Sequence, residues 1–347
     1  MNLNKFFTTT KAGYAYFLVH FSIEVACFYF LFSRLVIQDG WWLFALLYDA
    51  LAFLPQNVLG FIADKFKKIP YGAIGCALML IALLLPFDYL SLFLIGIGNA
   101  FAHVDGAQHT LRGNKGKISP NAIYVGGGAF GIVTGQLLGR TCVRLLVLLP
   151  ISLMLVSILI CVAFTLNHTI DEKSSINEYN LHNSIPTLPF LALIIIAVAC
   201  RSYTSYAIPT AWNKTVVQTV LLFAFMGIGK ILGGVLADNI GYKTTTLISL
   251  FLSIPFLVFG DTLMTVSLIG IMLFNMTMPI TVGLVVSKFN ETPCFAFGIT
   301  TFALFLGVTP AFFIRPTTLL SYQITCTLSC LIALSCILAT LKSKHRR

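Results

Sequence analysis

Long apolar runs follow one another along this chain, and they limit its possible folds more than any other feature. A helix needs about 20 mainly apolar residues to cross the hydrocarbon core of a bilayer. Twelve runs of roughly this length can be identified, and most are separated by short polar turns. The sequence therefore predicts an all-α polytopic membrane protein with twelve transmembrane helices. The predicted spans are about 13–36, 41–63, 70–87, 89–111, 119–139, 143–166, 187–208, 214–237, 243–260, 262–286, 292–313 and 317–341.

The balance of charged and apolar residues agrees with this class. Charged residues make up 10% of the 347 residues and hydrophobic residues 58%. Soluble domains carry about a quarter charged residues, so we expect the apolar surplus of this chain to face the lipid bilayer. A net charge of +10 would suggest nucleic acid as the partner of a soluble protein. Here the basic residues lie between apolar runs, where they set topology, and we expect no binding to nucleic acid.

The basic residues also predict the orientation. With the N-terminus placed in the cytoplasm, fifteen Lys and Arg residues fall in cytoplasmic segments and six at the outer ends of the spans. Cytoplasmic loops of membrane proteins carry the excess of Lys and Arg. We therefore expect both termini in the cytoplasm, with the protein integral to a bacterial cytoplasmic membrane.

One long polar stretch, at about 167–186, divides the chain into two halves of six spans. The predicted domains are an N-terminal six-helix bundle at 1–168, a cytoplasmic linker at 169–186 and a C-terminal six-helix bundle at 187–347. The same turn occurs at the same place in each half, since Gly60-Phe-Ile-Ala-Asp64-Lys65 follows the second span and Gly234-Val-Leu-Ala-Asp238 ends the eighth. A duplicated six-helix unit is typical of transporters with internal repeats.

The repeated turn resembles the loop signature G-x-x-x-D-R-x-G-R-K of the major facilitator superfamily. Gly234, Asp238, Gly241 and Lys243 match it in the second copy, whereas the first copy has Lys67 at the inner glycine position. The resemblance implies two pseudo-symmetric six-helix bundles that give alternating access to one small-molecule substrate. It also implies a monomer without a cofactor, driven by a gradient of protons or another ion.

The chemistry of the turn suggests a gate at the cytoplasmic side. Gly60 and Gly234 let two helices approach closely. Asp64 and Asp238 can then accept hydrogen bonds from backbone N–H groups at the start of a neighbouring helix, and from basic residues such as Lys65. Such a contact can join the two halves and release them during transport. The alternative is a helix-capping turn with no role in switching.

The fifth span is rich in glycine, with Gly131, Gly135 and Gly139 four residues apart. These residues resemble the glycine motif of antiporters in the superfamily, although Gln136 and Arg140 depart from it. The stretches 96–103 and 201–209 resemble the fosmidomycin-resistance-like, drug-exporting branch. The alternative for the glycines is a small-residue face that packs against another helix.

Charged side chains inside the spans are costly, and they usually face a cavity or a partner. Glu24 lies near the middle of the first span and is our best candidate for a proton- or cation-binding carboxylate, with His20 one turn away. The alternative is a static buried ion pair. Asp49 in the second span is either a second carboxylate of the pathway or a partner for Arg34. Lys230 in the eighth span requires an anion, which could be Glu24, Asp49 or an anionic substrate.

The fourth span carries a polar cluster near its cytoplasmic end. His103, Asp105 and His109, together with Arg112, form either a polar patch at the inner mouth or a proton relay. Their spacing is not that of a known zinc motif, and we expect no metal there. Four further residues are predicted to complete the substrate cavity: Arg201, Gln56, Asn99 and Asn275.

Three functions remain open. The first is proton-coupled export of small amphipathic organic compounds, which the glycine-rich fifth span and the many aromatic residues favour. The second is proton-coupled import of a small anionic metabolite, which Lys230 and Arg201 favour. The third, a non-transporting membrane sensor or an enzyme, has little support, because no catalytic motif and no soluble domain are present. We expect no enzymatic activity.

Overall fold

The computed structural model describes residues 11–141, 143–167 and 185–341, and all regular structure in these ranges is helical. The predicted linker 169–186, apart from its last two residues, and both chain ends lie outside the described residues. The helices of the first half are α2 (Lys11–Phe30), α3 (Trp41–Phe53), α4 (Gln56–Lys65), α5 (Tyr71–Leu84), α6 (Asp88–Leu111), α7 (Ser119–Arg140) and α8 (Leu148–Asn167). Those of the second half are α9 (Thr187–Ala207), α10 (Val216–Ile240), α11 (Tyr242–Thr246), α12 (Leu252–Phe259), α13 (Met264–Asn275), α14 (Thr277–Lys288), α15 (Pro293–Val308) and α16 (Leu319–Thr340).

Several of these helices join into longer rods. Within the described residues, eleven helical segments are long and apolar enough to cross a membrane, among them Lys11–Leu35, Trp41–Lys65 and Met264–Lys288. Helix α5 is apolar but shorter, with 14 residues. The prediction of a polytopic all-helical integral membrane protein is confirmed.

Proline and local irregularity divide the second span. Pro55 lies between α3 and α4, because proline has no backbone N–H and cannot continue the hydrogen-bond ladder of a helix. The break leaves Asp49 on α3 and Asp64 in the last turn of α4. One span thus places its two aspartates on two different helical segments.

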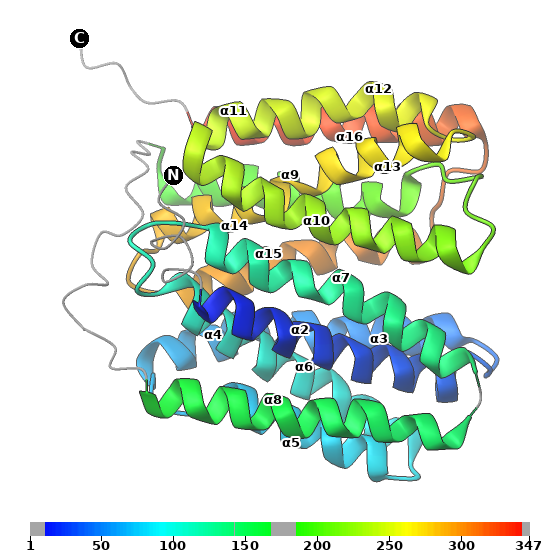
Figure 1. Ribbon diagram of the computed structural model, residues 1–347. Coiled ribbons are helices and arrows are strands. Elements are labelled where there is room, and N and C mark those ends of the chain that lie inside the picture. Colours follow the sequence, from blue (N-terminus) through cyan, green and yellow to red (C-terminus); the bar gives the residue numbers. More distant parts are fainter. Residues whose placement is uncertain (1–10, 142, 168–184, 342–347) are drawn as a thin grey trace.

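Figure 1 shows α2–α8 gathered on one side of the molecule and α9–α13 with α16 on the other, with α14 and α15 nearer the middle. Within the first group α2 packs along α7, and α5 packs on α6 and α8. Within the second, α9 packs on α15 and α16, and α10 packs on α13. The groups meet where α7 contacts α10 and where α4 contacts α15.

Glycines make the contact between α2 and α7 very close. A Cβ atom added at Gly131, Gly135 or Gly139 would meet the α2 backbone at Phe21, Val25 or Tyr29. Small residues in such a row allow two membrane helices to approach closely. The glycine row of the fifth span is therefore a helix-packing face, which is the second of the two readings that the sequence left open.

Candidate functional site

A cavity of about 250 Å³ lies between the two groups of helices. A second cavity, of about 210 Å³, shares Phe28, Tyr48, Asp49 and Tyr206 with it and extends to Trp41 at the start of α3. We call this end of the molecule the open end, and the end that carries Asp64 and Asp238 the latch end. Lining residues come from α2, α3, α6 and α7 and from α9, α10, α13, α14 and α15, so both halves of the chain contribute.

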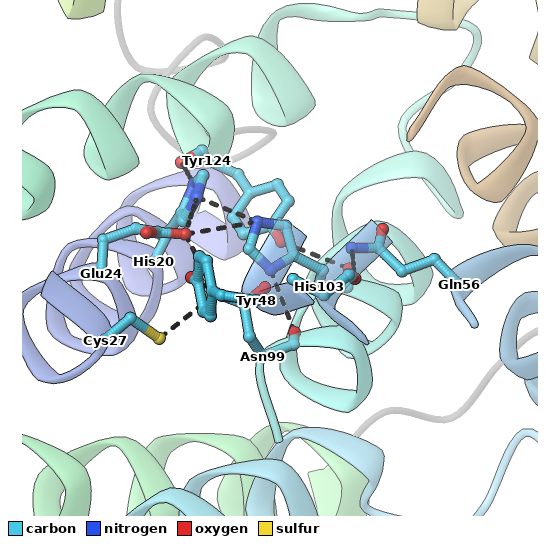
Figure 2. Close-up of polar contacts among 9 residues, drawn as sticks. His20, Glu24, Cys27, Tyr48, Gln56, Asn99, His103 and Tyr124 are labelled. Carbon is cyan, nitrogen blue, oxygen red and sulfur yellow. Dashed lines mark hydrogen bonds and ion pairs between the residues drawn. The ribbon is translucent and has the colours of Figure 1, made fainter. Parts of the chain in front are cut away.

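Glu24 lies in this cavity beside two histidines (Figure 2). Its Oε1 atom is 3.6 Å from His20 Nε2 and 3.8 Å from His103 Nε2. The two Nε2 atoms are 3.1 Å apart. All three side chains are buried, with at most 9% of each exposed. The structure thus joins His103, predicted at the inner mouth, to the pair His20 and Glu24 from the first span.

The backbone holds both rings in place. His20 Nδ1 lies 2.9 Å from the carbonyl oxygen of Tyr124, and His103 Nδ1 lies 3.0 Å from the carbonyl oxygen of Asn99. A carbonyl oxygen only accepts hydrogen bonds, so each Nδ1 carries a hydrogen atom. In a neutral ring the lone pair then resides on Nε2. The Nε2 atoms of His20 and His103 face each other, so both of these atoms carry a lone pair.

Asn99 connects this group to its surroundings. Its Nδ2 donates to Glu24 Oε1 at 3.2 Å and to the Tyr48 hydroxyl oxygen at 3.0 Å, and it lies 3.4 Å from the Cys27 sulfur. Figure 2 shows these side chains, which come from α2, α3 and α6. Asn99 was predicted to line the cavity and does so.

Two cations from the other half of the chain line the same cavity, and of these Arg201 is buried and Lys230 is half-buried. Arg201 of α9 is 6% exposed, and its Nε atom has no hydrogen-bond partner in the described part of the chain. Lys230 of α10 also lines the cavity. Their charges repel each other, and Lys230 is attracted to Glu24 without forming an ion pair. Among the described residues, neither cation has a carboxylate within ion-pair distance.

The other predicted cavity residues divide into two groups. Asp49 and Asn275 both line the cavity, and Asn275 Nδ2 donates to the carbonyl oxygen of Ile271 at 2.8 Å. Gln56 is fully buried beside the Pro55 break, where Nε2 donates to the carbonyl oxygen of Ala52 at 2.7 Å. Gln56 does not line the cavity, so its predicted role there is not supported.

At the latch end, Asp64 crosses from the first half to the second. Its carboxylate accepts hydrogen bonds from the backbone N–H groups of Cys294 at 3.1 Å and Phe295 at 2.8 Å, in the first turn of α15. Arg112 donates to the same carboxylate, with Nη2 at 2.5 Å from Oδ1. A Cβ atom added at Gly60 would meet the backbone of Cys294, so glycine permits this approach.

Asp238 makes the reciprocal contact. Its two carboxylate oxygens accept from the backbone N–H groups of Ile118 and Ser119, each at 2.9 Å, at the start of α7. A Cβ atom at Gly234 would meet Ala122 of the same helix. A helix N-terminus carries unpaired N–H groups and a partial positive charge. Each aspartate therefore caps a helix of the opposite half. The expected contact is present, and in each case its partner belongs to the other bundle.

The remaining residues of the two turns differ between the copies. Gly241 has a φ of +86° and ends α10, where a side chain would be strained. The Lys67 position in the first copy does not have a positive φ. Lys65 and Lys243 are exposed, and in the described part of the chain neither side chain forms a hydrogen bond or ion pair with Asp64 or Asp238.

The polar cluster predicted at the inner mouth is separated into three parts, since His103 belongs to the cavity. The Tyr16 hydroxyl donates to Asp105 Oδ2 at 2.6 Å, and His109 Nε2 lies 3.9 Å from Asp105 Oδ1. Arg112 instead pairs with Asp64. The prediction of a single cluster was wrong because helical spacing shows which residues share a face, and not which neighbouring helix each one meets.

Arg34 pairs with Asp88 rather than with Asp49. Its Nη2 atom is 2.6 Å from Asp88 Oδ1, and Nε donates to the same oxygen at 2.7 Å. Asp88 starts α6 and was not identified from the sequence. Tyr16 was also missed, although Tyr16, His20 and Glu24 follow one another at intervals of four residues and form a polar stripe on an apolar helix. That stripe was the available signal.

The comparisons with known proteins agree with this architecture. No family model matches the sequence, and no curated protein matches it. Among solved structures, the fucose:proton symporter FucP of E. coli is 15% identical with a TM-score of 0.60, covering 96% of this chain and 98% of that one. A second structure of FucP, in the outward conformation, is 14% identical with a TM-score of 0.55, covering 96% and 100%. The human organic anion transporter MFSD10 is 12% identical with a TM-score of 0.63, covering 96% and 97%. At such identities the likeness concerns the fold, and this chain has the major facilitator fold.

Proposed function

We propose that this protein is a secondary active transporter that carries a small organic anion across the membrane by alternating access. The observation that carries the proposal is the pair Arg201 and Lys230. Both are cations that line the central cavity without a carboxylate partner among the described residues. A buried charge is costly unless it is paired. An anionic cargo would supply the missing partner.

The geometry of the two cations suits a carboxylate or a similar group. A guanidinium group offers a planar fork of donors that matches two oxygens, whereas an ammonium group acts as a point charge. Arg201 and Lys230 lie close enough for their charges to interact. One anionic group placed between them would relieve this repulsion and satisfy the free Nε of Arg201.

The walls of the cavity favour a cargo that also has an apolar part. Ligand pockets are lined mainly by apolar side chains with a few placed polar groups. The cargo that fits is thus an amphipathic anion, which combines the amphipathic compound and the anionic metabolite that the sequence offered as alternatives. The apolar lining residues are Phe28, Phe53, Ile132, Met226, Met278, Leu304 and Val308.

The reciprocal contacts of Asp64 and Asp238 support alternating access. Both join the two halves at the latch end, while the cavities extend toward the open end. Breaking these few hydrogen bonds would let the latch end open without unfolding either half. The human structural neighbour is an organic anion transporter and the bacterial one a proton symporter, which supports a role in secondary transport.

The membrane topology forms part of the same proposal. Counting α5 with the eleven longer segments gives twelve spans, in two bundles at 1–168 and 187–347 joined by the linker 169–186. At 1.5 Å per residue, the 14 residues of α5 reach about 21 Å, so flanking residues would complete this crossing. We place the latch end in the cytoplasm, because Lys65 and Lys288 end helices there and Lys243 lies at the start of the span Tyr242–Phe259.

An ion gradient would drive the transport, and Asp49 is the carboxylate that we assign to coupling. It lines both cavities and forms no ion pair among the described residues. Its side chain could therefore meet an ion that arrives from the open end before the cargo binds. Export and import differ in the side of the membrane from which cargo and ion are taken up. Transport assays in inverted and in right-side-out vesicles distinguish the two directions.

A binding screen tests the cargo class. Purified protein in detergent is heated with matched pairs of an aromatic carboxylate and its neutral amide, for example benzoate and benzamide. We expect carboxylates to raise the unfolding temperature, amides to leave it unchanged, and Lys230→Gln to remove the effect. Lys214→Gln, an exposed lysine outside the cavity, is the control. Equal stabilisation by acid and amide would contradict an anion-binding site.

A further inference from the structure

We infer that His20, His103 and Glu24 form a binding site for a divalent transition-metal ion of the zinc class. All three ligand residues belong to helices α2 and α6. It does not depend on Arg201 or Lys230, so it goes beyond the proposed function and can be tested separately from it.

The first argument is the protonation of the two rings. Each Nδ1 faces a backbone carbonyl oxygen, that of Tyr124 for His20 and that of Asn99 for His103. Both Nε2 lone pairs then face each other across 3.1 Å, with the Glu24 carboxylate beside them. Three electron-rich atoms in one buried place repel one another unless a cation lies between them. The histidines of metal sites usually donate the other ring N–H to a carbonyl or carboxylate, as both do here.

The second argument is the size of the triangle that the three atoms form. Its sides are 3.1, 3.6 and 3.8 Å. A point about 2.0 Å from all three atoms exists, and zinc lies about 2.0–2.2 Å from nitrogen and oxygen ligands. The three atoms belong to a group that could hold a metal ion with all ligand atoms within 4.8 Å of one another. Little movement of the side chains is needed to bind an ion.

The third argument is the surroundings of the ligands. Asn99 Nδ2 donates to Glu24 Oε1 at 3.2 Å and orients the carboxylate. Gly128 of α7 faces the His20 ring, and a Cβ atom added there would meet that ring. All three ligands also line the central cavity. A fourth coordination position is therefore open to the cavity, as in zinc sites that exchange a ligand.

The choice of metal follows from the ligand types. Two imidazoles and one carboxylate suit zinc and its first-row neighbours, whereas magnesium and calcium prefer oxygen ligands alone. Sequence reasoning did not find this site, since it grouped His103 with Asp105 and His109 on the same helix. The two histidines are 83 residues apart in the chain, and only the packing of α2 against α6 brings them together.

Metal binding to the purified full-length protein tests the inference. After treatment with a chelator, the protein is dialysed against Zn²⁺ or Co²⁺ alone, and bound metal is measured by mass spectrometry. We expect one ion per chain in the wild type, and none at this site in Glu24→Gln or His103→Gln. Asn99→Leu, which keeps all ligands, should weaken binding about 10-fold or more, and Gly128→Ala should also weaken it. His109→Gln is the control variant that should bind normally.

A second measurement needs no variant. X-ray absorption at the zinc edge of the wild type should show nitrogen and oxygen ligands, including two imidazoles. Sulfur ligation would assign the metal to cysteines and overturn the inference. It would also be overturned if the wild type held no more metal than Glu24→Gln. In that case a proton shared between the two Nε2 atoms would be the cation of this site.

Discussion

Asp238 at the end of α10 caps the first turn of α7, with its two carboxylate oxygens 2.9 Å from the backbone N–H groups of Ile118 and Ser119. Asp64 does the same for α15. We predict that Asp238→Asn slows transport more than it weakens cargo binding, because an amide replaces one acceptor oxygen with a donor. Turnover in proteoliposomes and binding in detergent are compared in the same variant.

The control for this prediction is Asp39→Asn, an exposed aspartate at the open end. It should leave both quantities unchanged. If Asp238→Asn turns over as fast as the wild type, the contact has a purely structural role.

The Arg112–Asp64 ion pair predicts a difference in stability between two arginines. The side chains of Arg112 and Asp64 are each 3% exposed. Removing one partner of such a buried pair lowers the free energy of unfolding by about 3 kcal/mol or more. Arg34 and Asp88 are more exposed, at 24% and 34%, and such a pair contributes about 1 kcal/mol or less. Thermal unfolding should therefore show a much larger loss for Arg112→Gln than for Arg34→Gln. Equal losses would mean that Asp64 is held by its backbone donors alone.

The glycine row of α7 predicts sensitivity to small side chains. Gly131→Val would place atoms against the backbone carbonyl of Phe21, and overpacking of this kind costs about 1–3 kcal/mol. We expect a lower unfolding temperature and unchanged direction of transport. Leu137→Ala, on the same helix outside the row, should have a smaller effect. A Gly131→Val variant that is stable but reverses or uncouples transport would instead support the antiporter reading.

The ends of the spans could be predicted from sequence to within a few residues. The ninth span was predicted at 243–260 and is found at Tyr242–Phe259, and the twelfth at 317–341 and found at Leu319–Thr340. Hydrophobic length determines these limits locally. The repeated Gly and Asp were recognised because a turn of this type has a short sequence signature.

Contacts between helices could not be predicted in the same way. His103 was grouped with Asp105 and His109, because spacing along one helix was the only guide. Asp49 was one of two alternatives left open, a pathway carboxylate or a partner for Arg34. In the structure His103 meets His20, and Arg34 meets Asp88. These pairs depend on how far each helix is rotated and displaced against its neighbour. That rotation results from packing, including the close approach of α2 and α7 at the glycines.

Asp49 predicts how transport depends on the driving ion. Asp49→Asn should abolish accumulation of cargo against its gradient, because the side chain can no longer change its charge with the ion. Exchange of cargo across the membrane without net accumulation should continue, since Arg201 and Lys230 are intact. Accumulation is measured with an imposed pH gradient, and exchange by counterflow. Accumulation at the wild-type level would exclude Asp49 from coupling.

Counterflow in proteoliposomes tests the central claim most directly. Liposomes loaded with an unlabelled aromatic carboxylate are diluted into the labelled acid, and in parallel with its neutral amide. Wild-type protein should give a transient uptake of the acid and none of the amide. Lys230→Gln should require roughly 10- to 100-fold more acid, the loss expected when one charge-assisted hydrogen bond is removed. If the amide is exchanged as well as the acid, or if Lys230→Gln has no effect, the cavity does not select anions.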